Sequence, residues 1–286
     1  MNKLLSAEFS RLFKSMIFRA CLLFSGGYGM FMVLMRWWTV KNNAAAYADL
    51  DIEYRNADGL IFTGALVLIF VIAVLISAFV GTEYSEGTIR NKLIVGHTRT
   101  SIYFSKLIVC AVGTTTIHIL DILVVLILGN LLIEGTTMTV AEILAFTTVS
   151  TMAMLALTAL LLLFSVSIQS KSRATVVCLL TTIIMLFLAL AIQSGLEEPE
   201  YYDNVACVDG ETGEVISVDK EKNPSYLTGT KREVYEWLNT FLPVSQLYQV
   251  VINNSDHLGW IVIYDCIIIF VTTGAGIFGF KKMDLK

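Results

Sequence analysis

Six long apolar runs set the main constraint on how this chain can fold. They cover residues 16–35, 60–80, 107–133, 143–168, 174–193 and 258–280. A backbone in hydrocarbon must satisfy its own hydrogen bonds, so segments that cross about 30 Å of lipid form helices or a closed barrel. These runs are roughly twice as long as barrel strands and do not alternate in polarity. The sequence therefore predicts an all-α integral membrane protein with six transmembrane helices.

Basic residues between the runs predict the orientation. Charged residues make up only 15% of the chain, so their positions are informative. If the N-terminus is inside, most lysines and arginines fall on the cytoplasmic side, including Lys171 and Arg173 in one short connection. We therefore expect a multi-pass cell-membrane protein with both termini in the cytoplasm.

The N-terminal segment has an amphipathic pattern. Within residues 3–19, the side chains of Leu5, Phe9, Leu12 and Phe13 fall on one helical face. Such a basic amphipathic segment before a first span is typical of a helix that lies in the membrane interface. We expect an interfacial helix over residues 1–15, and a helix in solution is the alternative.

A polar insert precedes the last run. Residues 194–257 are strongly acidic, and the stretch "NVACVDGETGEVISVD" predicts a β-hairpin with its turn at Asp-Gly. Thr230 and Glu233 have the spacing of a capping box, and Pro243 should end the helix that they begin. We expect a small external α+β cap whose helices lean on the membrane surface.

The connection between the second and third runs, residues 81–106, is longer than a plain link between helices requires. We expect the second span to end at Gly81 and Thr82 to cap a short cytoplasmic helix, which Gly96 would stop. Its charged side chains recur at helical spacing and include Glu83. This helix is either an ordinary solvated connection or a docking element for a cytoplasmic partner.

A family resemblance favours the docking element. The stretch "EYSEGTIRNKLIVGHTRTSIYFSKL" resembles the segment after the second span in ABC transporter type-2 permeases, although Gly96-His97 stands where many members have proline. The similarity extends to the order of the spans, and Leu242–Gln246 resembles a Pro-x-x-Gln element of that family. The residues that follow the pattern are Glu83, Glu86, Gly87, Thr88, Arg90, Arg99 and Lys106.

The resemblance implies the membrane subunit of an ATP-driven exporter. Such permeases pair as two halves and bind cytoplasmic P-loop ATPase subunits, which hold ATP and Mg. Residues 81–106 would then be the coupling segment, and the second half would be the same chain or a paralogue. The exported compound would be a peptide or an amphipathic molecule, of the kind linked to antimicrobial peptide or antibiotic resistance. The implied ATPase-coupling residues are Glu83, Glu86, Gly87, Thr88, Arg90 and Arg99.

The chain shows no motor of its own. It contains no GxxxxGK[ST] phosphate-binding loop, so we predict that it is not an enzyme by itself. The stretch "GAGIFG" at Gly274–Gly279 matches GxGxxG, but it lies within the last apolar run, where small residues serve helix packing. No cofactor, metal site or nucleic-acid partner is expected in this chain, and membrane lipid is its surrounding.

Three ionisable residues lie inside the apolar runs. His118 and Asp121 share one face of the third run, and Asp265 lies in the sixth. Such groups are expensive in lipid unless they are paired or hydrated. They either line a translocation path or form structural hydrogen bonds between helices. In an alternative function they would serve an ion- or proton-coupled secondary transporter, and a membrane-embedded enzyme or sensor is a third class. An ATPase partner would separate the first class from the others.

Overall fold

The computed structural model describes residues 2–42, 56–203, 207–208, 215–217, 220–254 and 257–284. In this part of the chain, six helices are long and apolar enough to cross a membrane. Each coincides with one predicted run, so the six-helix prediction is confirmed. They are α2 (Met16–Asn42), α4 (Ala65–Ser85), α6 (Arg99–Leu132), α7 (Val140–Ser167), α8 (Lys171–Glu197) and α11 (Leu258–Lys282).

The helix ends differ from the limits of the apolar runs. The third span begins at Arg99 instead of residue 107, and the first extends to Asn42 instead of residue 35. Polar residues at a helix end can continue the same backbone hydrogen bonds beyond the lipid. Apolar content therefore marks the buried middle of such a helix and not its ends.

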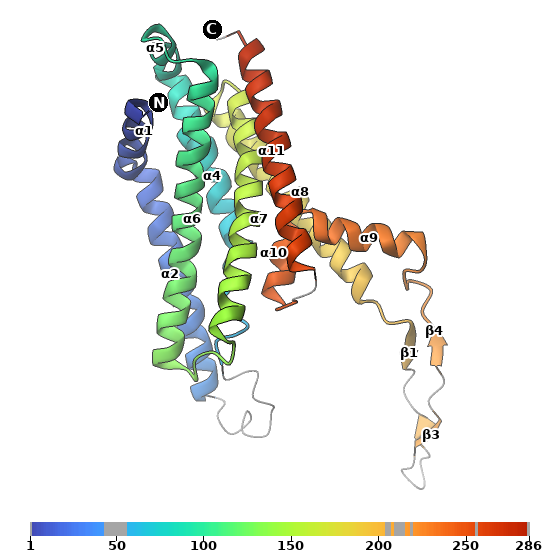
Figure 1. The fold of residues 1–286 in the computed structure, drawn as a ribbon. Coiled ribbons are helices and arrows are strands. Elements are labelled where there is room, and N and C mark those ends of the chain that lie inside the picture. The colour runs from blue at the N-terminus through green and yellow to red at the C-terminus, as the bar shows by residue number, and fades with distance from the viewer. Residues whose placement is uncertain are drawn as a thin grey trace.

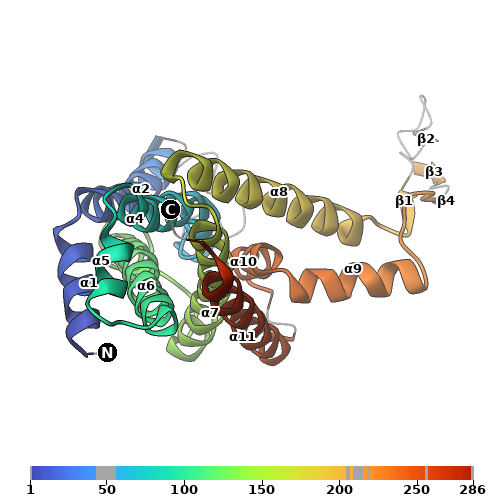
Figure 2. The same ribbon diagram turned by 90° about the horizontal axis from the view of Figure 1, so that it is seen from above.

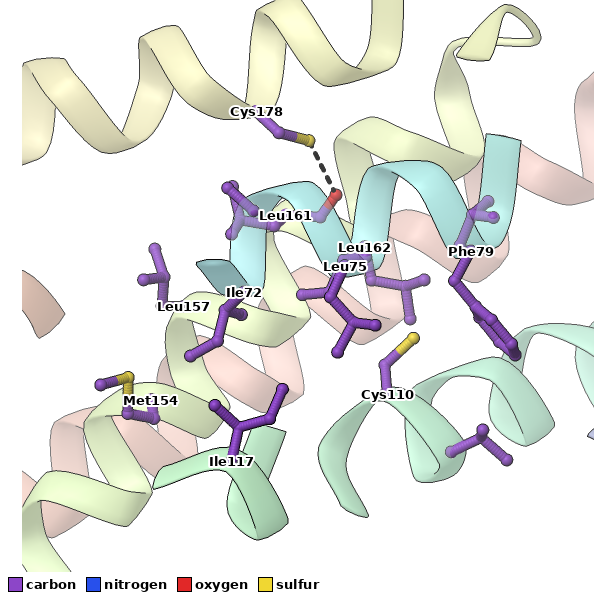
Figure 3. Packing of buried hydrophobic residues seen from close by; sticks show 14 of the residues in the cluster. Ile72, Leu75, Phe79, Cys110, Ile117, Met154, Leu157, Leu161, Leu162 and Cys178 are labelled. Carbon is purple, nitrogen blue, oxygen red and sulfur yellow. Dashed lines mark hydrogen bonds between the residues drawn. The ribbon is translucent and has the colours of Figure 1, made fainter. Parts of the chain in front are cut away.

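Helices α4 and α7 form the centre of the bundle. In each, 67% of the most apolar window is buried inside the protein, against 22–28% for α2, α8 and α11. Figure 3 shows Ile72 and Leu75 of α4 packed with Leu157 and Leu161 of α7. Apolarity alone does not explain this difference, because α8 has the same mean hydropathy of 2.8 as α4. Lipid is as apolar as a protein interior, so the other spans can leave apolar sides exposed to it.

Short helices complete the end of the bundle at which both termini lie (Figure 1). Helix α1 (Asn2–Lys14) packs against α6 and α2, and α5 (Thr88–Ile94) follows α4. The buried side of α1 contains Leu4, Glu8 and Leu12, whereas Phe13 is half exposed. A helix is therefore present in the predicted N-terminal region, with Leu4 and Leu12 against the bundle. Its position in the membrane interface stays a prediction.

An arm projects from the bundle on the side of α8 (Figure 2). Strand β1 (Tyr201–Asp203) pairs antiparallel with β4 (Lys220–Lys222), and β2 (Cys207–Val208) pairs antiparallel with β3 (Val215–Ser217). The β2–β3 pair lies within the stretch that was predicted to form a hairpin. Its Asp209-Gly210 turn lies outside the described residues. Helix α9 (Thr230–Phe241) lies beside α8.

The start of α9 corrects one prediction. Thr230 is the first residue of the helix, Gly229 is its cap, and no side chain makes a capping hydrogen bond. The expected capping box with Glu233 is therefore wrong. Gly229 has φ 58° and ψ −145°, a conformation that suits glycine, and this turn carries the chain directly into the helix.

Helix α10 (Pro243–Val251) starts at the proline that ends α9, as predicted. Its residues Val244, Leu247 and Val250 are fully buried, and the helix packs against α7, α8 and α4. The expectation that this helix leans on the membrane surface is therefore wrong, because protein covers it. Two glutamines of α10, Gln246 and Gln249, are also buried.

These glutamines fasten α10 to the end of α9. The amide nitrogen of Gln246 donates to the carbonyl of Thr240 at 2.8 Å, and that of Gln249 donates to the carbonyl of Asn239 at 2.7 Å. The last carbonyls of a helix lack partners within the helix. In the Pro-x-x-Gln element, the proline therefore ends α9 and the glutamine caps the C-terminal end of α9.

Candidate functional site

A glycine divides the predicted coupling segment into two helices. Helix α4 continues to Ser85, beyond the expected end at Gly81, and the hydroxyl of Thr82 donates to the carbonyl of Ala78 at 2.8 Å inside α4. Thr82 therefore caps nothing, which corrects that prediction. Gly87 then adopts φ 66°, the left-handed conformation that glycine tolerates best, and α5 begins.

This break separates residues that a continuous helix would keep on one face. Glu86 and Arg90 are exposed, whereas the side chain of Glu83 is fully buried. The backbone turn at Gly87 changes the direction of the chain between them. Glu83 therefore belongs to the interior of the protein in this structure, and Glu86 and Arg90 belong to its surface.

Five charged side chains meet beneath α5, and we name them the ion cluster: Glu8 and Arg11 of α1, Glu83 of α4, Lys92 of α5 and Lys106 of α6. The Lys92 ammonium lies 2.7 Å from the Glu83 carboxylate and also donates to Glu8. The Glu83 carboxylate pairs with Lys106 and Arg11 as well. The cluster therefore connects four helices through one buried carboxylate.

The cations exceed the anions in this cluster. It contains the carboxylates of Glu8 and Glu83 against the three cations of Arg11, Lys92 and Lys106. The side chains of Glu8, Glu83 and Lys106 are at most 1% exposed. Removing one partner of such a buried pair leaves the other charge uncompensated, and this typically destabilises a protein by about 3–5 kcal/mol.

The outer side of α5 has an apolar tip. Ile94 is 82% exposed and Val95 is 78% exposed, and Arg90 and Asn91 of the same short helix are exposed as well. Ile89 holds the opposite side of α5 against the core. Ile94 and Val95 were not among the residues predicted from the sequence. The sequence signal that could have identified them is their position directly before Gly96, at the end of a charged helix.

Arg99 has a different position from the other predicted coupling residues. One of its guanidinium nitrogens donates to the carbonyls of Phe280, Lys281 and Met283 at 2.7, 3.0 and 2.6 Å. These carbonyls lie at the C-terminal end of α11, where a cation is electrostatically favourable. Arg99 therefore joins the start of α6 to the end of α11.

His118 forms a hydrogen bond between two central helices. Its Nε2 lies 2.8 Å from the hydroxyl of Ser150 on α7. One turn away, the hydroxyls of Thr114 and Thr158 lie 2.9 Å apart and join the same two helices. Polar contacts of this kind connect helices in membranes. This geometry matches the structural interpretation of His118.

Asp121 is packed against glycine backbones. A Cβ atom added to Gly64 would lie 1.8 Å from the Oδ2 atom of Asp121, and one added to Gly29 would lie 2.9 Å from its Oδ1 atom. Asp265 lies beside Gln246 of α10. Among the described residues, the Asp121 carboxylate has no hydrogen-bond partner. The structure therefore does not connect His118, Asp121 and Asp265 into one site.

Comparison with known proteins identifies the family. Residues 4–193 match the family described as "ABC-2 family transporter protein". No curated protein matches this chain. The family match runs from α1 to the last turn of α8 and includes α5 and the ion cluster. Since it covers well over half of the 286 residues, the chain belongs to the ABC-2 family of transporter proteins, as a multi-pass membrane permease subunit that is not itself catalytic.

Proposed function

We propose that this permease is the membrane subunit of an ATP-driven exporter and that α5 receives the motion of separate P-loop ATPase subunits. The observation that supports this is the apolar tip of α5, formed by Ile94 and Val95. The tip lies at the end of the bundle that holds both termini (Figure 1), which we predict to be cytoplasmic. Exposed apolar patches with a polar rim commonly mark protein interaction sites.

The ion cluster gives α5 a mechanical connection to the spans. A movement of α5 would move Lys92, which forms hydrogen bonds with Glu8 of α1 and Glu83 of α4. Glu83 is in turn bonded to Lys106 of α6. Movement of α5 would therefore displace α1, α4 and α6 together. In this proposal Glu86 and Arg90 border the ATPase contact, whereas Glu83 transmits the motion from within.

Transport direction and substrate rest on the family and on charge. We propose export of a peptide or amphipathic compound through a pair of permease halves, and this step is an analogy at the level of the family. Acidic residues far outnumber basic ones in residues 194–257, which we predict to be external. An acidic surface would attract a cationic compound and would lose that attraction as salt is added.

The secondary-transporter alternative has less support. It would use His118, Asp121 and Asp265 as a chain of ionisable groups. His118 is instead bonded to Ser150, and among the described residues no hydrogen bond or ion pair joins it to either carboxylate. No direct contact among the described side chains therefore supports a relay through these three groups.

The tip of α5 provides the test. The double variant Ile94→Asp, Val95→Asp places two charges in the proposed contact without altering a buried residue. The matched control is Val140→Asp, which changes an aliphatic side chain that is 74% exposed at the first residue of α7. Each protein is purified from native membranes with a tag, its partners are identified by mass spectrometry, and ATP hydrolysis by the complex is measured.

We expect the wild-type protein and the Val140→Asp variant to retain a partner whose sequence contains GxxxxGK[ST]. The double variant should lose that partner and at least about tenfold of the hydrolysis rate, as expected when an interaction hot spot worth more than 1.4 kcal/mol is removed. Full retention of the ATPase and of hydrolysis in the double variant would contradict the role of α5. Absence of any ATPase from the wild-type complex would contradict the exporter.

A further inference from the structure

A groove of about 440 Å³ lies where α1 meets α4. Its polar lining includes the basic side chains of Arg11 and Lys14 and the hydroxyl groups of Ser10 and Ser15. Among the described residues that line it, Glu86 is the one carboxylate. The groove therefore combines a positive side with several hydrogen-bond donors.

The charge of the ion cluster favours the binding of an anion in this groove. By formal charge its two carboxylates face three cations, and its members are largely withdrawn from water. Burial of an unpaired charge is costly, so a nearby anion would stabilise this arrangement. Arg11 is the most exposed member, with 29% of its side chain accessible, and it also lines the groove.

Arg11 and Lys14 can both bind a further oxygen anion. Arg11 uses part of its guanidinium on the Phe79 carbonyl at 3.2 Å and stacks over the Phe79 ring at 3.9 Å. A guanidinium has five N–H donors, so the Phe79 contact and the ion pairs with Glu8 and Glu83 leave capacity for a further oxygen. Lys14 is exposed and forms no ion pair with any described residue. Together they present two cations that suit a phosphate group.

The surroundings of the groove indicate where such a phosphate comes from. The groove also includes Ser15 and Ile17, where α1 passes into α2, and α2 is a membrane-spanning helix that begins at Met16. Met16 is 85% exposed and Phe13 is half exposed beside it. Apolar side chains exposed at the start of a span contact the lipid chains, and a basic amphipathic helix before a span attracts anionic lipids.

We propose that this groove binds the phosphate headgroup of an anionic phospholipid, taken from the leaflet at the end of the bundle where α1 lies. The phosphate contacts Arg11 and Lys14 and offsets the excess positive charge of the ion cluster. The acyl chains lie along the exposed apolar side of α2. The bound lipid thereby stabilises the junction of α1, α4 and α5. This proposal does not depend on the direction of transport or on the substrate.

Native mass spectrometry of the purified full-length protein tests this binding. The protein is titrated in detergent with phosphatidylglycerol, with phosphatidylcholine and, in a separate arm, with phosphatidylglycerol in competition with inorganic phosphate. One charge pair compares Lys14→Gln with Lys3→Gln, which removes the same charge from an exposed residue of α1 that does not line the groove. Lys14→Arg restores the charge.

A second pair of variants fills the groove without changing any charge. Ala7→Trp places a large side chain at the groove lining, and Ser6→Trp places it on the neighbouring exposed residue, which does not line the groove. Ala7 and Ser6 are both exposed, so neither change disturbs a packed core. This pair therefore separates a shaped site from general attraction between α1 and anionic lipid.

We expect tight binding of one phosphatidylglycerol and weaker binding of phosphatidylcholine. Lys14→Gln should weaken the phosphatidylglycerol site roughly fivefold, the effect of one basic side chain near an anionic surface, and Lys14→Arg should restore it. Ala7→Trp should abolish the site, and Lys3→Gln and Ser6→Trp should leave it unchanged. Equal loss in Lys14→Gln and Lys3→Gln, or no loss in Ala7→Trp, would overturn the proposal. Displacement of the lipid by millimolar inorganic phosphate would overturn its assignment to a lipid.

Discussion

The ion cluster and the carboxylate of Asp121 are both buried in this bundle, under opposite electrostatic conditions. In the cluster, Glu83 contacts three cations that come from three other helices. Asp121 has no hydrogen-bond partner among the described residues and lies directly against the backbones of Gly29 and Gly64. Cations therefore surround the carboxylate of Glu83, whereas the carboxylate of Asp121 occupies the room left by glycines that have no side chain.

This difference shows two ways in which a membrane protein accommodates an acid. Glu83 has the usual solution of a buried charge, which is pairing with cations. Asp121 instead depends on close fit, since no side chain is present at Gly29 or Gly64 to exclude it. Loss of charge should therefore matter most at Glu83, and a change of volume should matter most around Asp121.

The largest effect is expected from Glu83→Gln. The substitution keeps the size of the side chain and removes the charge that compensates Lys92 and Lys106. We expect a loss of about 3–5 kcal/mol in the free energy of unfolding, as for other broken buried ion pairs. Thermal unfolding of the purified protein in detergent measures this loss as a lower midpoint.

Glu86→Gln is the matched control for this change, because it removes the same charge from an exposed residue three positions later. Exposed substitutions usually alter stability by less than about 0.5 kcal/mol. If the two variants unfold at the same temperature, the charge of Glu83 does not stabilise the protein. The proposed difference between Glu83 and Asp121 would then be wrong.

A smaller effect is expected when volume is added next to Asp121. The backbone of Gly64 has φ −56°, which any residue adopts, so the requirement for glycine at this position is one of space. Gly64→Ala should destabilise the protein by about 1–3 kcal/mol, as overpacking does elsewhere. Combining it with Asp121→Ala should recover part of that loss, because the carboxylate with which the new methyl group collides is removed.

Unfolding midpoints of the two single variants and the double variant form a double-mutant cycle that measures this coupling. Gly59→Ala is the control, because a Cβ atom at Gly59 meets nothing within 4 Å. Strictly additive effects of Gly64→Ala and Asp121→Ala would show that Asp121 is not held by close fit to this glycine.

The smallest effect is expected at Asp58. This carboxylate accepts hydrogen bonds but is only partly buried, so it shows the effect of hydrogen bonding without deep burial. Partial burial raises the pKa of the Asp58 carboxyl, but hydrogen bonds from Thr136, Thr137 and the Met138 backbone outweigh it and lower the pKa. The backbone N–H of Thr137 donates to this carboxylate at 3.0 Å. The folded protein thus favours the charged form of an acid that remains partly in water.

The pH dependence follows from the sign of this shift. Since the pKa is lower in the folded state, the stabilisation is present above the unfolded value of about 3.9 and is lost as pH falls through the folded value. Below about pH 4 the wild-type protein should therefore lose its advantage over Asp58→Asn. We expect a difference of a few tenths of a kcal/mol at neutral pH, reduced by solvent screening. Unfolding midpoints of both proteins between pH 3 and 7 measure it, and parallel curves would argue against this contribution.

Part of the candidate site was accessible from the sequence. The position of the short helix after the second span, its charged residues and its stop near Gly96 agree with α5, which ends at Ile94 with Gly96 in a left-handed conformation. The roles of individual residues could not be predicted from the sequence. Helical spacing placed Glu83 with Glu86 and Arg90, because it assumed one continuous helix where Gly87 makes a turn.

The sequence alone determined the six spans and, with them, the class of the protein. Whether about 20 residues can cross hydrocarbon as a helix depends on their own composition, since the hydrogen bonds of a helix are local. Only the tertiary structure decided that Glu83 meets Arg11 and Lys106, that Asp121 faces two glycines, and that Arg99 caps α11. These contacts join residues far apart in the chain. Spacing along one helix tells which side chains share a face, and only packing decides which other helix that face meets.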